Sequence, residues 1–390
     1  MNITSLRPLL LLFLLVAVPE IASAQDVILR IICDLPNSDS ESSGVYIQSR
    51  DSIWSVNDNA NPSEIHLIDT FGNKFREIDI VGASNLDWEE LAHDDAGNLY
   101  IGDFGNNTND RQDLRVLRIV NPQEAQSPTA LAEIINFSYE DQTEFPPLLN
   151  QWYYNCEAML LMGDTVFVFT KDYSFPYIGF TRIYWFLNTP GEHVAAFFGS
   201  FYTFPGSIPK GSITGAAISP DRSKVILVSN RKLWLFRNFE GQNFLNGEVH
   251  EFDFPEDTQK EAVAFADECT VYITDERDAG NNTGGFVYEW DLCAWLQTNT
   301  TQVAEQKANI AVFPQPSFGD VTLRYDLPAA YPTAVLWLYD PLGRLICQRE
   351  LDTHAGDINF TSLILNAKGI YHYRITASAQ QIAAGNLQVL

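Results

Sequence analysis

The chain has 390 residues, of which 46% are hydrophobic and 13% aromatic, so it carries enough apolar side chains to form the cores of about two domains. Its formal net charge is -26, and nearly all of this charge falls between the N-terminal apolar stretch and residue 309. A surface this acidic repels phosphate backbones and anionic lipid, which argues against nucleic acid or direct lipid binding.

The N-terminus carries a segment that we expect to direct export. Arg7 precedes the apolar run PLLLLFLLVAVP, and the small residues at 22–24 stand where a signal peptidase cuts. The run is shorter than the roughly 20 apolar residues that span a bilayer. We therefore expect residues 1–24 to be a signal peptide that is cleaved before Gln25, and a mature chain without a membrane span.

A repeated pattern covers the central part of the chain. Each unit has a short apolar strand, a turn with Asp, Gly or Ser, and a second strand rich in Val, Ile, Tyr and Phe; the units begin near Glu41, Glu89, Glu157, Thr214 and Glu261. Third and fourth strands follow in the first four units. Four short strands at a spacing of about 50 residues are typical of a β-propeller blade. The sequence therefore predicts an all-β fold with a β-propeller at residues 25–296.

The fifth unit offers only three strands, which raises the question of how the ring closes. We expect residues 27–35, VILRIICDL, to supply the missing strand, because closure removes the exposed edges of a sheet array. This gives five four-stranded blades. Six blades are the alternative, since residues 107–150 are long enough to hold one more.

The repeat also predicts a polar rim at one mouth of the central channel, which the first strand of each blade lines. Glutamates stand where first strands begin, at Glu41, Glu89, Glu157 and Glu261. Polar residues stand where second strands end, at Asp58, Asp103, Lys171, Asn230 and Asp275. We expect these side chains, drawn from separate blades, to form a ligand-binding rim.

Two kinds of chemistry fit such a rim. Ca²⁺ takes six to eight oxygen ligands, and Glu89, Glu157 and Glu261 could supply carboxylates to one ion. Alternatively the carboxylates act as general acids or bases, with pKa values raised by mutual repulsion. A third interpretation gives each glutamate only a structural role, bonding backbone N–H groups. Basic side chains could neutralise the rim in place of a metal, at Arg111, Lys171, Arg231 and Arg277.

His93 is a weak candidate for catalysis. It lies four residues after Glu89 on the same expected strand, and strand alternation would place both side chains on one side. A single histidine is more often a packed or surface residue.

The chain has five cysteines, an odd number for an exported protein. Cys269 starts the second strand of the last unit, and Cys293 follows the end of its third strand. Because antiparallel neighbours bring these two ends together, Cys269 and Cys293 are the predicted disulfide.

The last part of the chain differs in character. After a polar linker at residues 297–308, residues 309–390 contain FPQP, the turn YDPLGR, the strand GIYHYRI and a terminal stretch around Gly385. These elements resemble the type A C-terminal sorting domain of the bacterial type IX secretion system, although Gln315 stands where the family usually has Asn. The resemblance implies an Ig-like β-sandwich, passage across the outer membrane through the type IX machinery, and usually removal of this domain with release of the cargo or its attachment to the surface.

The central repeats are similar to a broad group of secreted phytase-like and lactonase-like propellers. In the enzymatic members a Ca²⁺ ion at the channel mouth polarises the substrate. No Gly-x-Ser-x-Gly, HExxH or phosphate-cradling glycine loop is present. We therefore expect a secreted or surface-displayed module that binds a ligand or partner at the channel mouth. The alternative is a Ca²⁺-dependent hydrolase of a lactone, a phosphoester or a related ester. No organic cofactor is expected.

Overall fold

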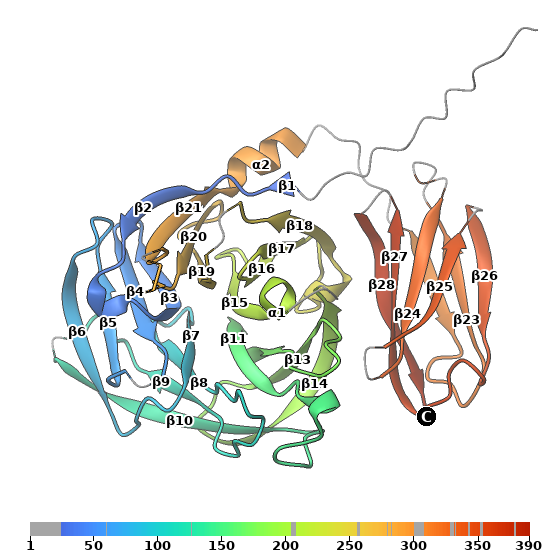
Figure 1. Cartoon of the computed structure of the whole chain (residues 1–390), viewed down its shortest axis with the longest axis horizontal. Helices are drawn as coiled ribbons and strands as arrows, with labels where there is room; N and C mark the ends of the chain where they lie inside the picture. Colours follow the sequence, from blue (N-terminus) through green and yellow to red (C-terminus); the bar gives the residue numbers. More distant parts are fainter. Residues whose placement is uncertain are drawn as a thin grey trace, which may run out of the picture.

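The computed structural model describes residues 25–299 and 308–390, apart from positions 60, 126, 204–207, 256–257, 279, 282, 328–330, 332, 342–343, 352–353 and 378–379. The predicted signal peptide lies outside the described residues. In Figure 1 a ring of sheets occupies one side of the molecule, and a smaller pair of sheets stands beside it.

The ring consists of five four-stranded blades that follow one another along the chain, and parallel pairing of their outer strands joins the first three blades into one sheet. The first three blades are β3 (Ser42–Ser49), β4 (Ser52–Asn57), β5 (Glu64–Ile68) and β6 (Lys74–Val81); β7 (Trp88–His93), β8 (Leu99–Asp103), β9 (Arg115–Ile119) and β10 (Thr129–Tyr139); and β11 (Asn155–Met162), β12 (Thr165–Lys171), β13 (Phe180–Leu187) and β14 (Gly191–Tyr202). The last two are β15 (Ile213–Ile218), β16 (Lys224–Ser229), β17 (Lys232–Arg237) and β18 (Glu248–Asp253); and β19 (Lys260–Phe265), β20 (Thr270–Asp275), β21 (Phe286–Asp291) and β2 (Arg30–Asp34).

The innermost strands close the ring around a central channel. Each of β3, β7, β11, β15 and β19 lies against the innermost strand on either side, and β19 lies against β3. The prediction of a β-propeller with five blades is therefore confirmed. The alternative sixth blade is wrong, because residues 107–150 contain β9, β10 and the short 3-10 helix η2 (Leu149–Gln151) in their described part.

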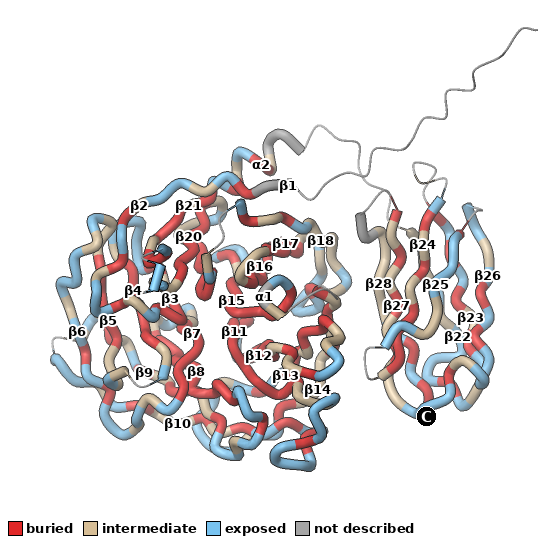
Figure 2. Tube along the Cα trace, viewed as in Figure 1, coloured by how far each residue is buried: buried red, intermediate tan, exposed pale blue. Residues whose placement is uncertain are grey.

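The blades are buried on both faces, which explains the nearly continuous apolar runs in their central strands. In β17 the side chains of Leu233 and Leu235 point into the core between the fourth and fifth blades. Trp234 and Phe236, which alternate with them, point into the core between the third and fourth blades. Figure 2 shows the same burial along the inner strands of all five blades. Hydrophobic packing between blades therefore holds the ring together.

The N-terminal segment closes the ring, as predicted, but it does so in two places. β2 pairs antiparallel with β21 and completes the last blade. The two residues of β1 (Gln25–Asp26) pair in parallel with β18, the outer strand of the fourth blade. The strand predicted at residues 27–35 is therefore shorter, and the chain before it joins the neighbouring blade.

The predicted disulfide between Cys269 and Cys293 is confirmed. Cys293 belongs to α2 (Leu292–Asn299), which follows β21 directly. The linker predicted to begin at residue 297 thus starts within a helix. The described residues contain no helix that is long and apolar enough to cross a membrane.

Residues 309–390 form two antiparallel sheets. The strands of the first are β22 (Asn309–Phe313), β23 (Val321–Asp326) and β26 (Ala355–Phe360), and those of the second are β25 (Leu345–Leu351), β24 (Ala334–Tyr339), β27 (Gly369–Ala377) and β28 (Gln380–Val389). Alternate side chains of both sheets share one hydrophobic core, which includes Leu323, Leu336 and Tyr371. This core contains no residue of the propeller, so the two parts are built around separate cores.

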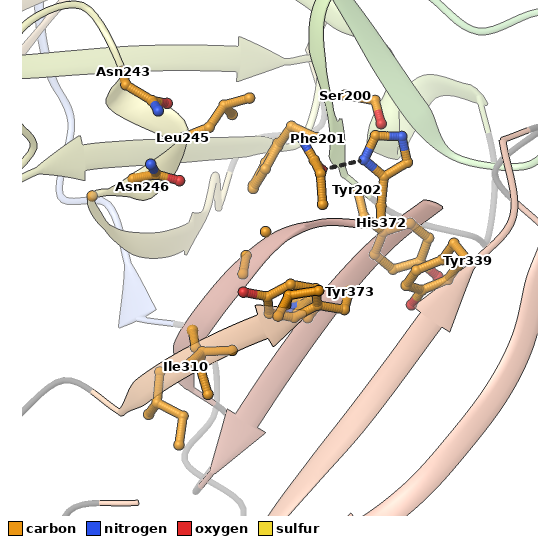
Figure 3. Close-up of a pocket in the computed structure, with 18 of the residues that line it drawn as sticks. Ser200, Phe201, Tyr202, Asn243, Leu245, Asn246, Ile310, Tyr339, His372 and Tyr373 are labelled. Atoms are coloured by element: carbon orange, nitrogen blue, oxygen red, sulfur yellow. Dashed lines mark hydrogen bonds between the residues drawn. The ribbon is translucent and has the colours of Figure 1, made fainter. Parts of the chain in front are cut away.

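An aromatic junction joins the two parts. The ring of Tyr339 packs against Phe180 and Tyr202 of the third blade, with ring centroids 5.2 and 5.3 Å apart. His372 lies against Phe180 and Phe197. A cavity of about 590 Å³ opens beside this junction, lined by side chains from both parts (Figure 3). The cavity is bounded by the third and fourth blades and does not include the predicted rim.

Candidate functional site at the channel mouth

The three predicted metal ligands occupy the same structural position in three blades. At its start each innermost strand carries one extra residue relative to its partner strand, and these bulged residues are Ser43, Glu89, Glu157, Thr214 and Glu261. A β-bulge redirects a side chain and recurs next to functional sites. The bulge therefore presents one polar side chain per blade at one mouth of the channel.

Blades without glutamate at the bulge use a hydroxyl to join neighbouring blades. The Ser43 hydroxyl donates to the backbone carbonyl of Trp88 at 2.9 Å, and the Thr214 hydroxyl donates to that of Lys260 at 2.8 Å. Each acceptor carbonyl immediately precedes a bulged glutamate of the next blade. These two bonds fix the backbone from which Glu89 and Glu261 project.

Lys171, at the end of β12, pairs with one of the three glutamates. Its Nζ is 3.1 Å from Glu157 Oε2. Glu157 also accepts a hydrogen bond from the Asn155 amide, and Glu261 accepts one from the Gln259 amide at 2.5 Å. All three glutamates are at least nine-tenths buried. The mouth is therefore a buried ionic cluster with carboxylates from three blades and one ammonium group.

Burial and mutual repulsion shift the proton affinities of the cluster. Burial raises the pKa of Glu89 well above its usual range, and the charges of Glu157 and Asp87 add to this. Burial likewise raises the pKa of Glu261. Burial alone would lower the pKa of Lys171, but Glu157 and Glu261 outweigh it and raise that pKa well above its usual value. Lys171 is therefore charged at neutral pH.

Three further acids lie around the three glutamates: Asp87, which is buried, and Asp58 and Glu276, which are partly exposed. Burial raises the pKa of Asp58 to about 7, with help from Glu276 and Glu41. Burial also raises the pKa of Glu276 to about 7, against the opposing charge of Lys171. Asp87, whose carboxylate accepts a hydrogen bond from Asn59 at 2.7 Å, has its pKa raised by burial. The mouth thus has more acids than bases, and two of its acids, Asp58 and Glu276, have pKa values raised to about 7.

Glu90, which follows the bulged Glu89, links the innermost strands of the second and fourth blades. The residues that follow the bulge in the other four blades are all glycine or alanine, namely Gly44, Ala158, Gly215 and Ala262. These small side chains leave room for one glutamate. A Cβ on Gly44 would lie 2.3 Å from the backbone N of Leu91, and one on Gly215 would lie 2.6 Å from the carbonyl oxygen of Glu261. The innermost strands therefore approach each other too closely for larger residues at these points.

The Glu90 carboxylate satisfies backbone groups from opposite sides of the channel. It accepts the N–H of Leu91 at 2.9 Å and, from the fourth blade, the N–H of Ala216 at 3.1 Å. These N–H groups lie on the inner edges of innermost strands, where no further strand can pair with them. Glu90 is fully buried, and burial raises its pKa well above the usual range. Its role is therefore structural.

Replacing Glu90 with alanine is expected to destabilise the fold by about 2 to 4 kcal/mol, because two buried N–H groups would lose their acceptor. Urea unfolding of Glu90→Ala measures this cost. Glu240→Gln on an exposed loop is the control and should change stability by less than about 0.5 kcal/mol. A Glu90→Ala protein as stable as the control would contradict this role.

Not every predicted rim residue belongs to the mouth cluster. Glu41 is exposed, bonds the Asn61 amide at 2.7 Å and acts through its charge on the outer acids Asp58 and Glu276, while Ser43 takes the bulge position that corresponds to Glu89. The prediction that Glu41 is equivalent to Glu89, Glu157 and Glu261 is therefore wrong, because the equivalent residue is Ser43, two positions later. Asn230 follows β16 as expected and is half-buried, and no hydrogen bond in the described part of the chain links it to the glutamates.

Asp103 and Asp275 end second strands as predicted, but both carboxylates turn into their own blades. Asp103 is fully buried between Arg111 and Arg115, at 3.2 and 2.8 Å. Asp275 is fully buried between Tyr288 Oη at 2.7 Å and Lys260 Nζ at 3.4 Å. Their charges are already compensated, so they hold the ends of strands together and do not face a ligand.

His93 is not part of the mouth. It lies at the far end of β7, where it pairs with Leu99, and its ring packs on Tyr46 with centroids 4.2 Å apart. The expected alternation fails because the bulge at Glu89 shifts the side-chain pattern by one residue. At about 3.3 Å per residue the strand also separates the two side chains. His93 is therefore a poor candidate for chemistry with Glu89.

Sequence reasoning missed Asp58 as a titrating group and missed Asp87, Glu90 and Glu276 altogether. Both Asp87 and Glu276 are close in sequence to a predicted rim residue. Asp87 lies two positions before Glu89, and Glu276 directly follows Asp275. Glu90 could have been found by aligning the five units on the bulged residue. At the aligned position the other four units have only glycine or alanine.

The chain has low sequence identity to known proteins. No family model matches the chain, and no curated protein matches it in sequence. Among solved structures it is similar to a PQQ-bound aldose sugar dehydrogenase from Streptomyces coelicolor (12% identity, 68% of this chain and 97% of that one, TM-score 0.42). It is also similar to PorZ, a surface component of the type-IX secretion system of Porphyromonas gingivalis (13% identity, 90% of this chain and 45% of that one, TM-score 0.32). The WD40 repeats of RRP9 are a third case (12% identity, 68% and 97%, TM-score 0.36). These similarities concern the fold alone.

Proposed function

We propose that this chain is a secreted β-propeller protein, displayed on the cell surface or released, whose channel mouth binds a ligand that carries a positive charge. The observation that supports this most directly is that three buried glutamates, Glu89, Glu157 and Glu261, occupy the same bulge position in three blades, while the Lys171 ammonium pairs with Glu157. Asp58, Asp87 and Glu276 add acidic groups that Lys171 alone cannot balance. A cation is the complementary partner for such a rim.

Calcium is one such cation, and a Ca²⁺-dependent hydrolase of lactones or phosphoesters is the second candidate function. Carboxylates with raised pKa values suit general acid or base catalysis, and this favours the enzymatic alternative. The described residues contain one group of at least three potential ligands whose ligand atoms lie within 4.8 Å of one another, and Glu89, Glu157 and Glu261 are not that group. The Lys171 ammonium already pairs with Glu157, one of the three carboxylates that a Ca²⁺ ion would need. A mouth that binds without catalysis is therefore the better account.

The test compares Ca²⁺ with 1,4-diaminobutane in calorimetric titrations of the mature chain. We expect the diamine to bind and to raise the melting temperature, and the double variant Glu89→Gln, Glu261→Gln to lose both effects while retaining the ion pair of Glu157 with Lys171. Glu240→Gln is the matched control. If Ca²⁺ binds instead, and ester turnover disappears in the double variant, the hydrolase is the correct assignment. Binding of neither cation would reject the proposed site.

For export we propose that residues 309–390 are an Ig-like sorting domain that the type IX machinery recognises. The support is the sequence resemblance together with a core that is separate from that of the propeller. Deleting the domain should therefore trap the propeller in the periplasm. A chain that ends at residue 300 is compared with the full chain by cell fractionation, and its folding is checked by thermal unfolding. Surface delivery of the folded, shortened chain would contradict the proposal.

A further inference from the structure

A second polar cluster lies on the outer part of the first blade, away from the channel. Glu64 and His66 are two residues apart on β5, and Glu77 on β6 is the antiparallel partner of His66. Because Ile65 and Leu67 point into the core between the first and second blades, Glu64 and His66 lie on the opposite face of the sheet. Sheet geometry thus gathers an imidazole and two carboxylates at one place.

The ligand atoms of these three residues all lie within 4.8 Å of one another. His66 Nε2 is 3.2 Å from Glu64 Oε2 and 3.8 Å from Glu77 Oε2. Ligand atoms at about 2.0 to 2.2 Å from a tetrahedral metal ion are about 3.4 Å apart. The cluster is therefore already close to the spacing that a divalent ion imposes.

The imidazole is also oriented as a metal ligand is. His66 Nδ1 lies 2.9 Å from Asp39 Oδ1, and Asp39 is itself fully buried and held by the Ser38 hydroxyl at 2.8 Å. A histidine that binds metal commonly gives its second ring N–H to a carboxylate, which fixes its tautomer and direction. Asp39 lies in the 3-10 helix η1 (Asn37–Asp39), just after the strand that closes the ring. Asp39 therefore aims Nε2 at the two glutamates.

Access and charge fit the same interpretation. The His66 side chain is only 5% exposed, whereas those of Glu64 and Glu77 are 21% and 44% exposed, so the cluster opens to solvent on the carboxylate side. Lys74 is the one cation that pairs with a ligand in the described part of this cluster, through Glu77. Lys74 is on the same strand as Glu77, so its ammonium competes with a metal ion for that carboxylate.

We propose that Glu64, His66 and Glu77 form a site for a divalent transition-metal ion, with Asp39 as the residue that positions His66. One imidazole and two carboxylates suit Zn²⁺, Mn²⁺ or Fe²⁺, and water completes the coordination. The site lies on β5 and β6 of the first blade, away from the channel mouth. It does not depend on the function proposed for the mouth.

The test uses Zn²⁺ and Co²⁺ as probes on the purified mature chain. We expect one equivalent of Zn²⁺ by calorimetry, a visible absorption band with Co²⁺ and a higher melting temperature in the presence of Zn²⁺. Glu64→Gln and Glu77→Gln should each abolish the stoichiometric binding. Asp39→Asn should weaken it by about 10- to 100-fold. Lys74→Met should strengthen it, because Glu77 is then released from its ion pair.

Two controls keep the outcome unambiguous. The channel-mouth variant Glu89→Gln, Glu261→Gln should bind Zn²⁺ as the wild type does, and so should Glu240→Gln. Glu77→Gln alters a half-exposed side chain, so it should fold even if a variant of His66 does not. No stoichiometric binding by the wild type, or binding that survives both glutamate variants, would overturn the site. An Lys74→Met protein that is less stable with unchanged Zn²⁺ affinity would show an ion-pair network in place of a metal site.

Discussion

A chain that begins at Pro36, and therefore lacks β1 and β2, is expected to lose cooperative unfolding or to aggregate. The deletion removes the outer strand of the last blade and leaves β21 with an unpaired edge. It also removes the buried side chains of Val27, Cys33 and Leu35, each contributing about 1.5 to 3 kcal/mol on burial. Their sum approaches the total stability of about 5 to 15 kcal/mol of a typical domain.

A chain that begins at Val27 is the matched control. It lacks only β1, whose two residues add a short parallel pairing to the fourth blade, and it retains every contact of β2. Thermal unfolding and light scattering of the two shortened chains and the mature chain provide the measurement. If the chain that begins at Pro36 melted cooperatively at the temperature of the mature chain, the ring would be held closed by contacts other than those of β2.

The blade pattern could be predicted because each blade repeats the same local signals. In β17, for example, the neighbouring side chains of Leu233 and Trp234 are both apolar because the two faces of the sheet pack into two different cores. The disulfide could be predicted for the same reason, since antiparallel neighbours fix which strand ends meet. The short pairing of β1 with β18 could not, because two residues carry no periodicity and the partner lies more than 220 positions away.

The candidate site was predicted in part. The starts of the first strands located Glu89, Glu157 and Glu261, but the pattern could not show that one extra residue bulges at each of them. That bulge explains why Ser43 replaces Glu41 in the set and why His93 does not share a side with Glu89. The cluster around His66 was not predicted, because it depends on the register that pairs His66 of β5 with Glu77 of β6 and on Asp39, which reaches His66 from η1.

Lys171→Met is expected to lower the stability of the propeller by about 3 to 5 kcal/mol at about pH 8, because it leaves the buried Glu157 carboxylate without its partner. The cost should be much smaller at about pH 5.5. Burial raises the pKa of Glu89, Glu157 and Glu261 in the folded chain. The folded chain therefore binds their protons more tightly than the unfolded chain does. The resulting stabilisation is complete below the pKa values of the unfolded chain and is lost as pH rises through those of the folded chain. At low pH these groups are protonated and no longer need the ammonium group.

The wild-type chain should also become less stable as pH rises, but by a smaller amount. Asp58 and Glu276, whose pKa values rise to about 7 through burial, lose stabilising protons between about pH 5 and pH 8. Each such group changes the free energy of unfolding by up to about 1.4 kcal/mol per pH unit. Stability should therefore rise as pH falls through this range, down to the point where paired acids elsewhere, such as Asp221 with Lys224, begin to protonate.

Urea unfolding at both pH values separates the ionic role of Lys171 from a packing role. The double variant Lys171→Met, Glu157→Gln removes both charges of the ion pair, so at about pH 8 it should be more stable than Lys171→Met alone. Arg222→Met, which breaks an ion pair with Asp95 in which both side chains are exposed, is the control and should cost no more than about 1 kcal/mol. If Lys171→Met were equally costly at both pH values, the side chain would act through its packing on Tyr173, and the acidic mouth would already be neutral without it. In that case the mouth would offer no net negative charge, and a cationic ligand would have no electrostatic reason to bind there.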